Sequence, residues 1–123
     1  TIFPPENRSL AQDIINNKGL LPSESPIGTP FSKDNFISRD RLQAGLSHTT
    51  IVIQTGVEGG TMHVANATLN AGKNLFVCQF KDEVTRNAVI SQGNKLLAQQ
   101  GAVYLKGSDN LHLIANRIKE NSR

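Results

Sequence analysis

A basic and aromatic segment stands out among the residues that could do chemistry. Lys33, Asn35, Phe36, Arg39 and Arg41 all fall within positions 33–41. Single-stranded nucleic acid requires these side-chain types, because cations bind phosphates and a ring or guanidinium plane stacks on an unpaired base. On a helix Arg39 and Arg41 would point about 200° apart, so they cannot both face one site. The same residues also fit a solvated connection in which Phe36 packs under the following helix.

A glycine-rich turn from Gly56 to Thr61 is the second candidate. It follows an apolar segment and precedes a helical one, and the free amides at a helix N-terminus attract phosphate. Gly59, Gly60 and Thr61 are therefore a candidate phosphate-binding turn. The alternative is that the glycines only permit a tight bend. The spacing is not G-x-G-x-x-G and no Walker A motif is present, so no nucleotide cofactor is expected.

The residues that usually support catalysis or metal binding form no recognisable pattern. His48, His63 and His112 are far apart and lack the spacing of metal ligands. Ser47 has neither a G-x-S-x-G elbow nor an evident base. We therefore expect no catalytic residues, no metal and no cofactor.

Composition and length suggest a small cytoplasmic domain. The chain has 123 residues and a formal charge of +3, which is mildly basic and favours polyanions slightly. The single cysteine, Cys78, lies in an apolar run and cannot form a disulfide framework, which indicates a reducing compartment. No apolar run approaches the roughly 20 residues of a membrane span, and no signal peptide is visible. We expect one domain over residues 1–123, in the cytoplasm and without a membrane partner.

The elements that must position these residues alternate between helices and strands. Glycine and proline positions and apolar spacing divide the chain. The predicted elements are a helix from a cap at Asn7 or Ser9 to 17–19, a strand at 20–24, a loop at 25–35, a helix at 37–46, a strand at 48–54, a helix at 62–71, a strand at 75–79, helical structure at 83–100 broken at Gly93, a strand at 102–105 and a helix at 109–119. Ile51, Val52 and Ile53 are consecutive, which predicts a strand buried on both faces. Such alternation is typical of a doubly wound α/β fold with a parallel sheet and helices on both faces.

Several motifs, taken in order, resemble the DprA/Smf DNA-processing proteins. They are Phe3–Asn7, Gly19–Glu24, Pro26–Pro30, Asn35–Phe36, Arg39–Arg41, Ala44–Ser47, Gly59–Thr61, Gly72–Val77, Gly93–Leu97 and Gly101–Val103. The resemblance covers essentially the whole chain. It implies a Rossmann-like fold whose first strand, with a Gly-Ser-Arg phosphate loop, would lie upstream of Thr1, so the domain is expected to be N-terminally truncated.

The resemblance also implies a function. It implies non-catalytic binding of single-stranded DNA, loading of a RecA-like recombinase, a homodimer, and a role in DNA recombination and natural transformation. The nucleic-acid-binding residues would be Lys33, Asn35, Phe36, Arg39 and Arg41, beside the phosphate-binding turn. The family's Arg-Asn-Arg reads Arg39-Asp40-Arg41 here, which adds a negative charge next to the proposed phosphate site.

A nucleotide-binding sensor or a LOG-like nucleotide-processing enzyme of a related Rossmann group is the alternative. Those enzymes carry a Gly-Gly-x-Gly-Thr-x-x-Glu turn. Aligning Gly60 and Thr61 with that turn places Val64 at the position of the catalytic Glu. Valine cannot exchange a proton, so a sensor that binds a nucleotide without turnover fits this sequence better than a nucleotide-processing enzyme.

Overall fold

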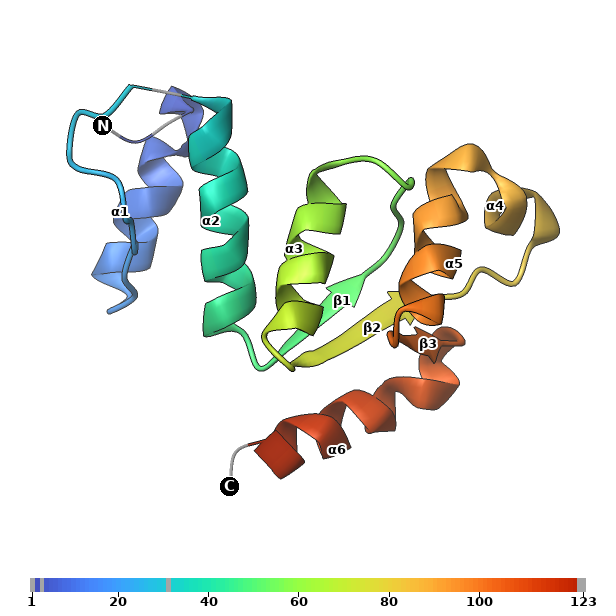
Figure 1. Ribbon diagram of the computed structural model, residues 1–123. Coiled ribbons are helices and arrows are strands. Elements are labelled where there is room, and N and C mark those ends of the chain that lie inside the picture. The colour runs from blue at the N-terminus through green and yellow to red at the C-terminus, as the bar shows by residue number, and fades with distance from the viewer. Residues whose placement is uncertain (1, 3, 31, 122–123) are drawn as a thin grey trace. The chain divides into compact units, whose positions relative to one another are not determined.

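The computed structural model describes residues 2, 4–30 and 32–121 of the chain. The chain forms two compact units, Thr1–Asn35 and Phe36–Arg123, and each is described separately below. Figure 1 shows the order of the elements along the chain.

Among the described residues of the first unit, α1, Arg8–Asn16, is the α-helix that lies wholly within it. A short 3-10 turn, Pro5–Asn7, leads into α1, which buries Ala11. The helix ends where Asn17 N–H donates to Asp13 O (3.0 Å) and Gly19 N–H to Ile14 O (2.8 Å), as the sequence predicted. The strand predicted at 20–24 is wrong, because these residues form no strand and Leu20 is exposed. The described residues of the unit offer no neighbouring strand, so the apolar pattern here has nothing to pair with.

The helix α2, Lys33–Leu46, begins four residues before its predicted start. The reason lies just upstream, where the hydroxyl of Ser32 accepts a hydrogen bond from the Asn35 N–H (3.2 Å), as at a helix N-cap. The predicted loop therefore ends at residue 32, and Lys33, Asp34 and Asn35 belong to the first turn of the helix.

The second unit is built on a parallel sheet. Its strands are β1, Thr49–Val52, β2, Asn74–Cys78, and β3, Val103–Leu105, in the order β1-β2-β3. Val52 pairs with Val77, and Val77 with Tyr104. The helices α3, Gly60–Asn70, and α5, Gln92–Gln99, lie on one face of the sheet, and α6, Leu111–Asn121, lies on the other (Figure 1). This confirms the predicted α/β class, a Rossmann-like parallel sheet with helices on both faces.

The core of this unit lies between the sheet and the helices α3 and α5. It contains Val52, Met62, Ala65, Leu75, Val77, Leu97 and Ala102. These residues come from two strands, two helices and the approach to β3. The core thereby fixes the ends of β1 and β2 relative to the helices that follow them.

The strand β1 is not buried on both faces as predicted. Val52 is 2% exposed, but Ile51 and Ile53 are 42% and 62% exposed. The strand lies at one edge of the described sheet. Of the three consecutive apolar residues, only Val52 is therefore fully covered by the rest of the unit.

The helical region after β2 is interrupted at Ala88 and not at Gly93 as predicted. Ala88 is extended (φ −59°, ψ 145°) between α4, Glu83–Asn87, and the 3-10 turn Val89–Ser91. Gly93 lies inside α5, where an added Cβ would overlap the carbonyl oxygen of Gly56 and lie 2.7 Å from its carbon. Its N–H donates to Thr55 O (2.9 Å). Glycine is therefore required here for close approach of two backbones.

The last helix begins slightly later than predicted. A 3-10 turn, Gly107–Asn110, precedes α6. Of the described helices, none combines the length and the apolar character that crossing a membrane requires.

Candidate nucleic-acid interface

A pocket in the second unit lies between α2, β1 and the start of α3. Its volume is about 440 Å³. We call it the α2–α3 pocket, and its lining residues are Phe36, Arg39, Asp40, Thr50, Ile51, Val52, Gly60, Thr61 and Val64. The structure thus brings together two segments that the sequence singled out independently.

Arg39 and Phe36 form the cationic and aromatic wall of this pocket. The guanidinium carbon of Arg39 lies 4.7 Å from the centre of the Phe36 ring, which is a cation–π contact. Arg39 Nη2 is also 3.9 Å from Asp40 Oδ1, and the Arg39 side chain is 52% exposed. The cation is therefore pre-positioned over a ring and still open to solvent, but it shares its charge with a buried carboxylate.

The pocket's opposite wall is the N-terminus of α3. Gly60 and Thr61 are the first residues of this helix, and their N–H groups have no intrahelical partner by the geometry of any α-helix. The helix dipole adds partial positive charge at the same place. The two walls together offer a guanidinium, a ring and backbone amides, a combination suited to a phosphate and its attached base.

Lys73 fixes the C-terminal end of α2 against this unit. Its ammonium donates to the carbonyl oxygens of Ala44 (3.3 Å), Gly45 and Ser47 (2.8 Å). These are carbonyls that a helix C-terminus leaves without partners, and a cation there also complements the helix dipole. Ala44 is almost completely buried, so α2 is held by packing as well as by charge.

Of the predicted binding residues whose side chains or backbone the structure describes, Asn35, Arg41 and Gly59 do not line the α2–α3 pocket. Asn35 belongs to the first unit, and its side-chain amide donates to Pro30 O (3.4 Å). Arg41 is exposed and has an interaction of its own. Gly59 precedes the wall as the N-cap of α3. The backbone of Lys33 begins α2, and its side chain lies outside the described residues.

The divergence of Arg39 and Arg41 agrees with the helical geometry expected from the sequence. Arg39 lines the pocket and Arg41 does not. The binding roles of all these residues stay predictions.

Asn94 is a positioning residue that the sequence did not single out individually. It is 4% exposed, and its carboxamide oxygen accepts the N–H of Thr55 (2.8 Å). Its amide nitrogen donates to Ile53 O and to Cys78 O, both at 2.9 Å. The side chain therefore ties the segment after β1, which leads to the glycine turn, to the end of β2. The Gly93-Asn94 pair was visible in the sequence, but its partners were not.

Comparison with known proteins places this architecture in a family. A sequence profile described as "DNA recombination-mediator protein A" matches residues 1–115. Protein Smf of Synechocystis sp. is 30% identical over 115 residues, which is 85% of this chain and 29% of that protein. DNA processing protein DprA of Bacillus subtilis is 36% identical over 75 residues, covering 61% of this chain and 25% of that protein.

A solved structure agrees with these sequence matches. The X-ray structure of DNA processing protein A (DprA) from Streptococcus pneumoniae superposes with a TM-score of 0.72 at 28% identity, covering 91% of this chain and 38% of that one. The chain spans less than a third of the length of the curated relatives described here. With the profile matching most of its length, the chain belongs to the DNA recombination-mediator protein A family, that is, the DprA/Smf family.

Proposed function

We propose that this chain binds single-stranded DNA without catalysing a reaction, as part of a protein that processes DNA for recombination. The observation that carries the proposal is the α2–α3 pocket, where Arg39 lies over Phe36 opposite the first amides of α3. Phosphates pair with guanidinium and amide groups, and an unstacked base packs on a ring. Every base has a planar face that can stack on a ring, so the Arg39 and Phe36 wall would bind a strand with little sequence specificity.

The lining of the pocket argues against turnover. Val64 lies in the pocket at the position where a LOG-like enzyme would need a glutamate. An isopropyl group can neither transfer a proton nor stabilise a developing cation. Asp40 is the acid of the pocket, and its carboxylate faces Arg39 across 3.9 Å. The carboxylate is placed to moderate the affinity of Arg39 for an anion.

We also propose two protein partners on the basis of family membership. One is a RecA-like recombinase that receives the bound strand, and the other is a second copy of the chain in a homodimer. Sedimentation equilibrium tests the homodimer, and a pull-down with purified recombinase in the presence of oligo-dT tests the first partner.

Fluorescence anisotropy with labelled oligo-dT tests the binding proposal. The chain should bind with an affinity that falls as salt rises, because phosphate contacts release counterions. Arg39→Gln should weaken binding and reduce the slope of log K against log salt by about 0.7, the value for one contact to a single strand. Lys119→Gln, an equal charge change on the exposed face of α6, is the matched control and should keep the slope.

Two results would contradict the proposal. One is the absence of saturable oligonucleotide binding at low salt. The other is an equal loss of affinity and slope in the Arg39 and Lys119 variants, which would mean that net charge and not the pocket is responsible. Saturable binding of a mononucleotide at the α2–α3 pocket, without strand binding, would favour the nucleotide sensor instead.

A further inference from the structure

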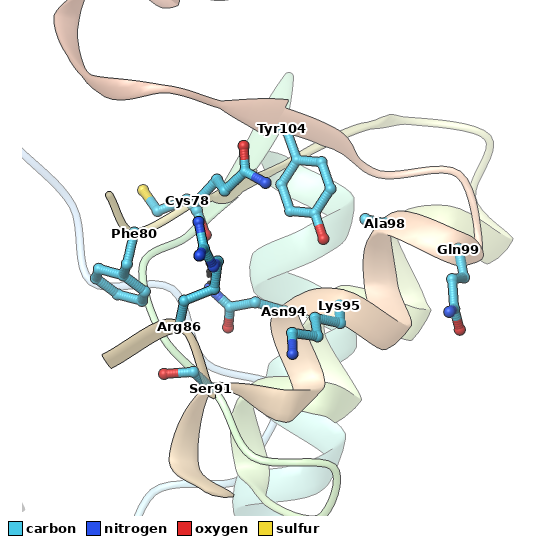
Figure 2. A pocket seen from close by; sticks show the side chains of 10 residues that line it. Cys78, Phe80, Arg86, Ser91, Asn94, Lys95, Ala98, Gln99 and Tyr104 are labelled. Carbon is cyan, nitrogen blue, oxygen red and sulfur yellow. Dashed lines mark hydrogen bonds between the residues drawn. The ribbon is translucent and has the colours of Figure 1, made fainter. Parts of the chain in front are cut away.

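A second pocket lies at the carboxyl end of β2, and it shares no lining residue with the α2–α3 pocket (Figure 2). Its volume is about 390 Å³. We call it the Tyr104 pocket, and the lining residues that matter here are Cys78, Phe80, Arg86, Lys95, Gln99 and Tyr104. In parallel α/β sheets, ligands bind outside the carboxyl ends of the strands, and this pocket occupies such a place.

The charge of the Tyr104 pocket is one-sided. Arg86 and Lys95 contribute two cations, and no carboxylate is among the lining residues. The Lys95 ammonium donates to Asn87 Oδ1 (3.0 Å), a neutral acceptor that leaves its charge uncompensated. Asp82 interacts electrostatically with Arg86, but it is not a lining residue of the pocket. Its carboxylate accepts a hydrogen bond from the Thr85 N–H at the start of α4 (2.9 Å). An anion that enters the pocket would therefore meet net positive charge.

Aromatic rings supply the apolar walls. Figure 2 shows Phe80 and Tyr104 on two sides of the pocket, with the Arg86 side chain extending between them in this view. Both rings are only partly buried, so part of their surface remains available to a planar group. Burial raises the pKa of the Cys78 thiol, which therefore stays neutral and acts as part of the apolar wall.

The pocket has a defined size and a fixed wall. About 390 Å³ is near the lower end of the roughly 300–1,000 Å³ usual for small-molecule sites. That volume suits one base with its sugar and phosphate better than a dinucleotide. Asn94 donates to Cys78 O (2.9 Å), which holds the end of β2 in place before any ligand arrives.

We propose that the Tyr104 pocket binds a single nucleotide, with the base against the Tyr104 and Phe80 rings and the phosphate on Arg86 and Lys95. The nucleotide can be a free nucleoside monophosphate or one unit of a strand, since both offer the same base and phosphate. The site does not depend on strand binding at the α2–α3 pocket, because the two pockets have separate linings.

Isothermal titration calorimetry of the 123-residue chain with dTMP, dAMP, dCMP and dGMP tests this site. At least one mononucleotide should bind with saturation and a stoichiometry near one. The double variant Arg86→Gln/Lys95→Gln should weaken it about tenfold or more, as expected for loss of two charge-assisted contacts. The matched control Arg117→Gln/Lys119→Gln removes the same charge from α6 and should leave the affinity unchanged.

Further variants separate this site from the proposed strand site. Tyr104→Ala should weaken mononucleotide binding while Tyr104→Phe retains it, because the ring and not the hydroxyl makes the contact. Arg39→Gln should leave mononucleotide binding unchanged even though it weakens oligo-dT. Displacement of the mononucleotide by oligo-dT identifies a unit of the strand as the source, and the lack of displacement identifies a free nucleotide.

Two outcomes overturn the proposal. One is a flat titration with all four mononucleotides while circular dichroism shows a folded chain. The other is binding that survives Arg86→Gln/Lys95→Gln but is lost in Arg39→Gln, which would assign the nucleotide to the α2–α3 pocket. Either result leaves the test of strand binding by anisotropy unaffected, so the two proposals fail separately.

Discussion

Replacing Asp40 by asparagine should strengthen the binding of single-stranded DNA. Asp40 is 8% exposed and lines the α2–α3 pocket, with Oδ1 3.9 Å from Arg39 Nη2. Asparagine has almost the same shape, so the substitution removes the charge and keeps the packing. The carboxylate opposes an incoming phosphate in two ways, because it neutralises Arg39 and repels the anion directly.

The distance between Arg39 and Asp40 and the exposure of Arg39 determine how much the affinity should rise. Coulomb's law gives about 1 kcal/mol for two unit charges at this separation in water, and about 4 kcal/mol at an effective dielectric constant of 20. Arg39 is half exposed, and ion pairs of this kind contribute at most about 1 kcal/mol in measured cycles. Freeing Arg39 should therefore tighten binding about fivefold, since 1.4 kcal/mol corresponds to a factor of ten.

Anisotropy titrations of labelled oligo-dT at two salt concentrations measure this gain. Glu120→Gln changes the net charge equally on the exposed surface of α6 and should produce a much smaller gain. A thermal melt of each variant checks that the fold is intact. Unchanged or weaker binding by a folded Asp40→Asn variant, or an equal gain in the Glu120 variant, would refute the reasoning that Asp40 restrains a phosphate-binding arginine.

Three further predictions concern the fold around both pockets. Gly93→Ala should destabilise the protein by about 1–3 kcal/mol because its Cβ would overlap the backbone of Gly56, whereas Gly45→Ala should stabilise it by about 0.5–1 kcal/mol because a Cβ there meets nothing within 4 Å. Urea unfolding measures both changes, and the same sign for the two would contradict this reasoning. Asn94→Ala should lower the free energy of unfolding by about 2–4 kcal/mol in the same assay, since it removes the three hydrogen bonds of a buried side chain. A loss below about 1 kcal/mol would show that water replaces these hydrogen bonds. Cys78 should react with iodoacetamide more slowly than a free thiol at neutral pH, and its reaction rate should rise only above the ordinary cysteine pKa, because burial raises the pKa of Cys78 and the thiolate is the nucleophile. A rate equal to that of a model thiol at pH 7 would contradict this prediction.

The fold class could be predicted because its signals are local. Helical spacing of apolar residues and short apolar runs lie within each element, and their alternation determines a parallel α/β arrangement. The strands β2 and β3 and the helix α3 were accordingly found within one or two residues of their bounds. The start of α2 was missed because the cap hydroxyl of Ser32 lay inside a segment whose composition suggested a loop.

The errors occurred where structure depends on a distant partner. Residues 20–24 have the apolar content of a strand but no described neighbour to pair with. Ile51 and Ile53 look like a buried strand, and their exposure is decided by the edge position of β1. Gly93 suggested a helix break, yet its role is close packing against Gly56, which lies 37 residues earlier.

The two candidate sites also differ in whether a local sequence signal could reveal them. Phe36, Arg39 and the glycine turn could be proposed as one site because a parallel sheet places the start of a following helix beside the end of a strand. The Tyr104 pocket could not, because its cations and rings come from separate elements between residues 78 and 104 and form no motif.

Asn94 links the chain segments that lead to the two pockets. The segment after β1 must turn toward α3, and the end of β2 must turn toward α4, so both leave backbone groups without sheet partners. One carboxamide satisfies three of these groups, with partners 16, 39 and 41 residues away in sequence. A single buried side chain therefore holds both the end of β2, which lines the Tyr104 pocket, and the segment that leads from β1 to the glycine turn before α3. Binding at either pocket can then use a preformed surface, which lowers the conformational entropy that a ligand must overcome.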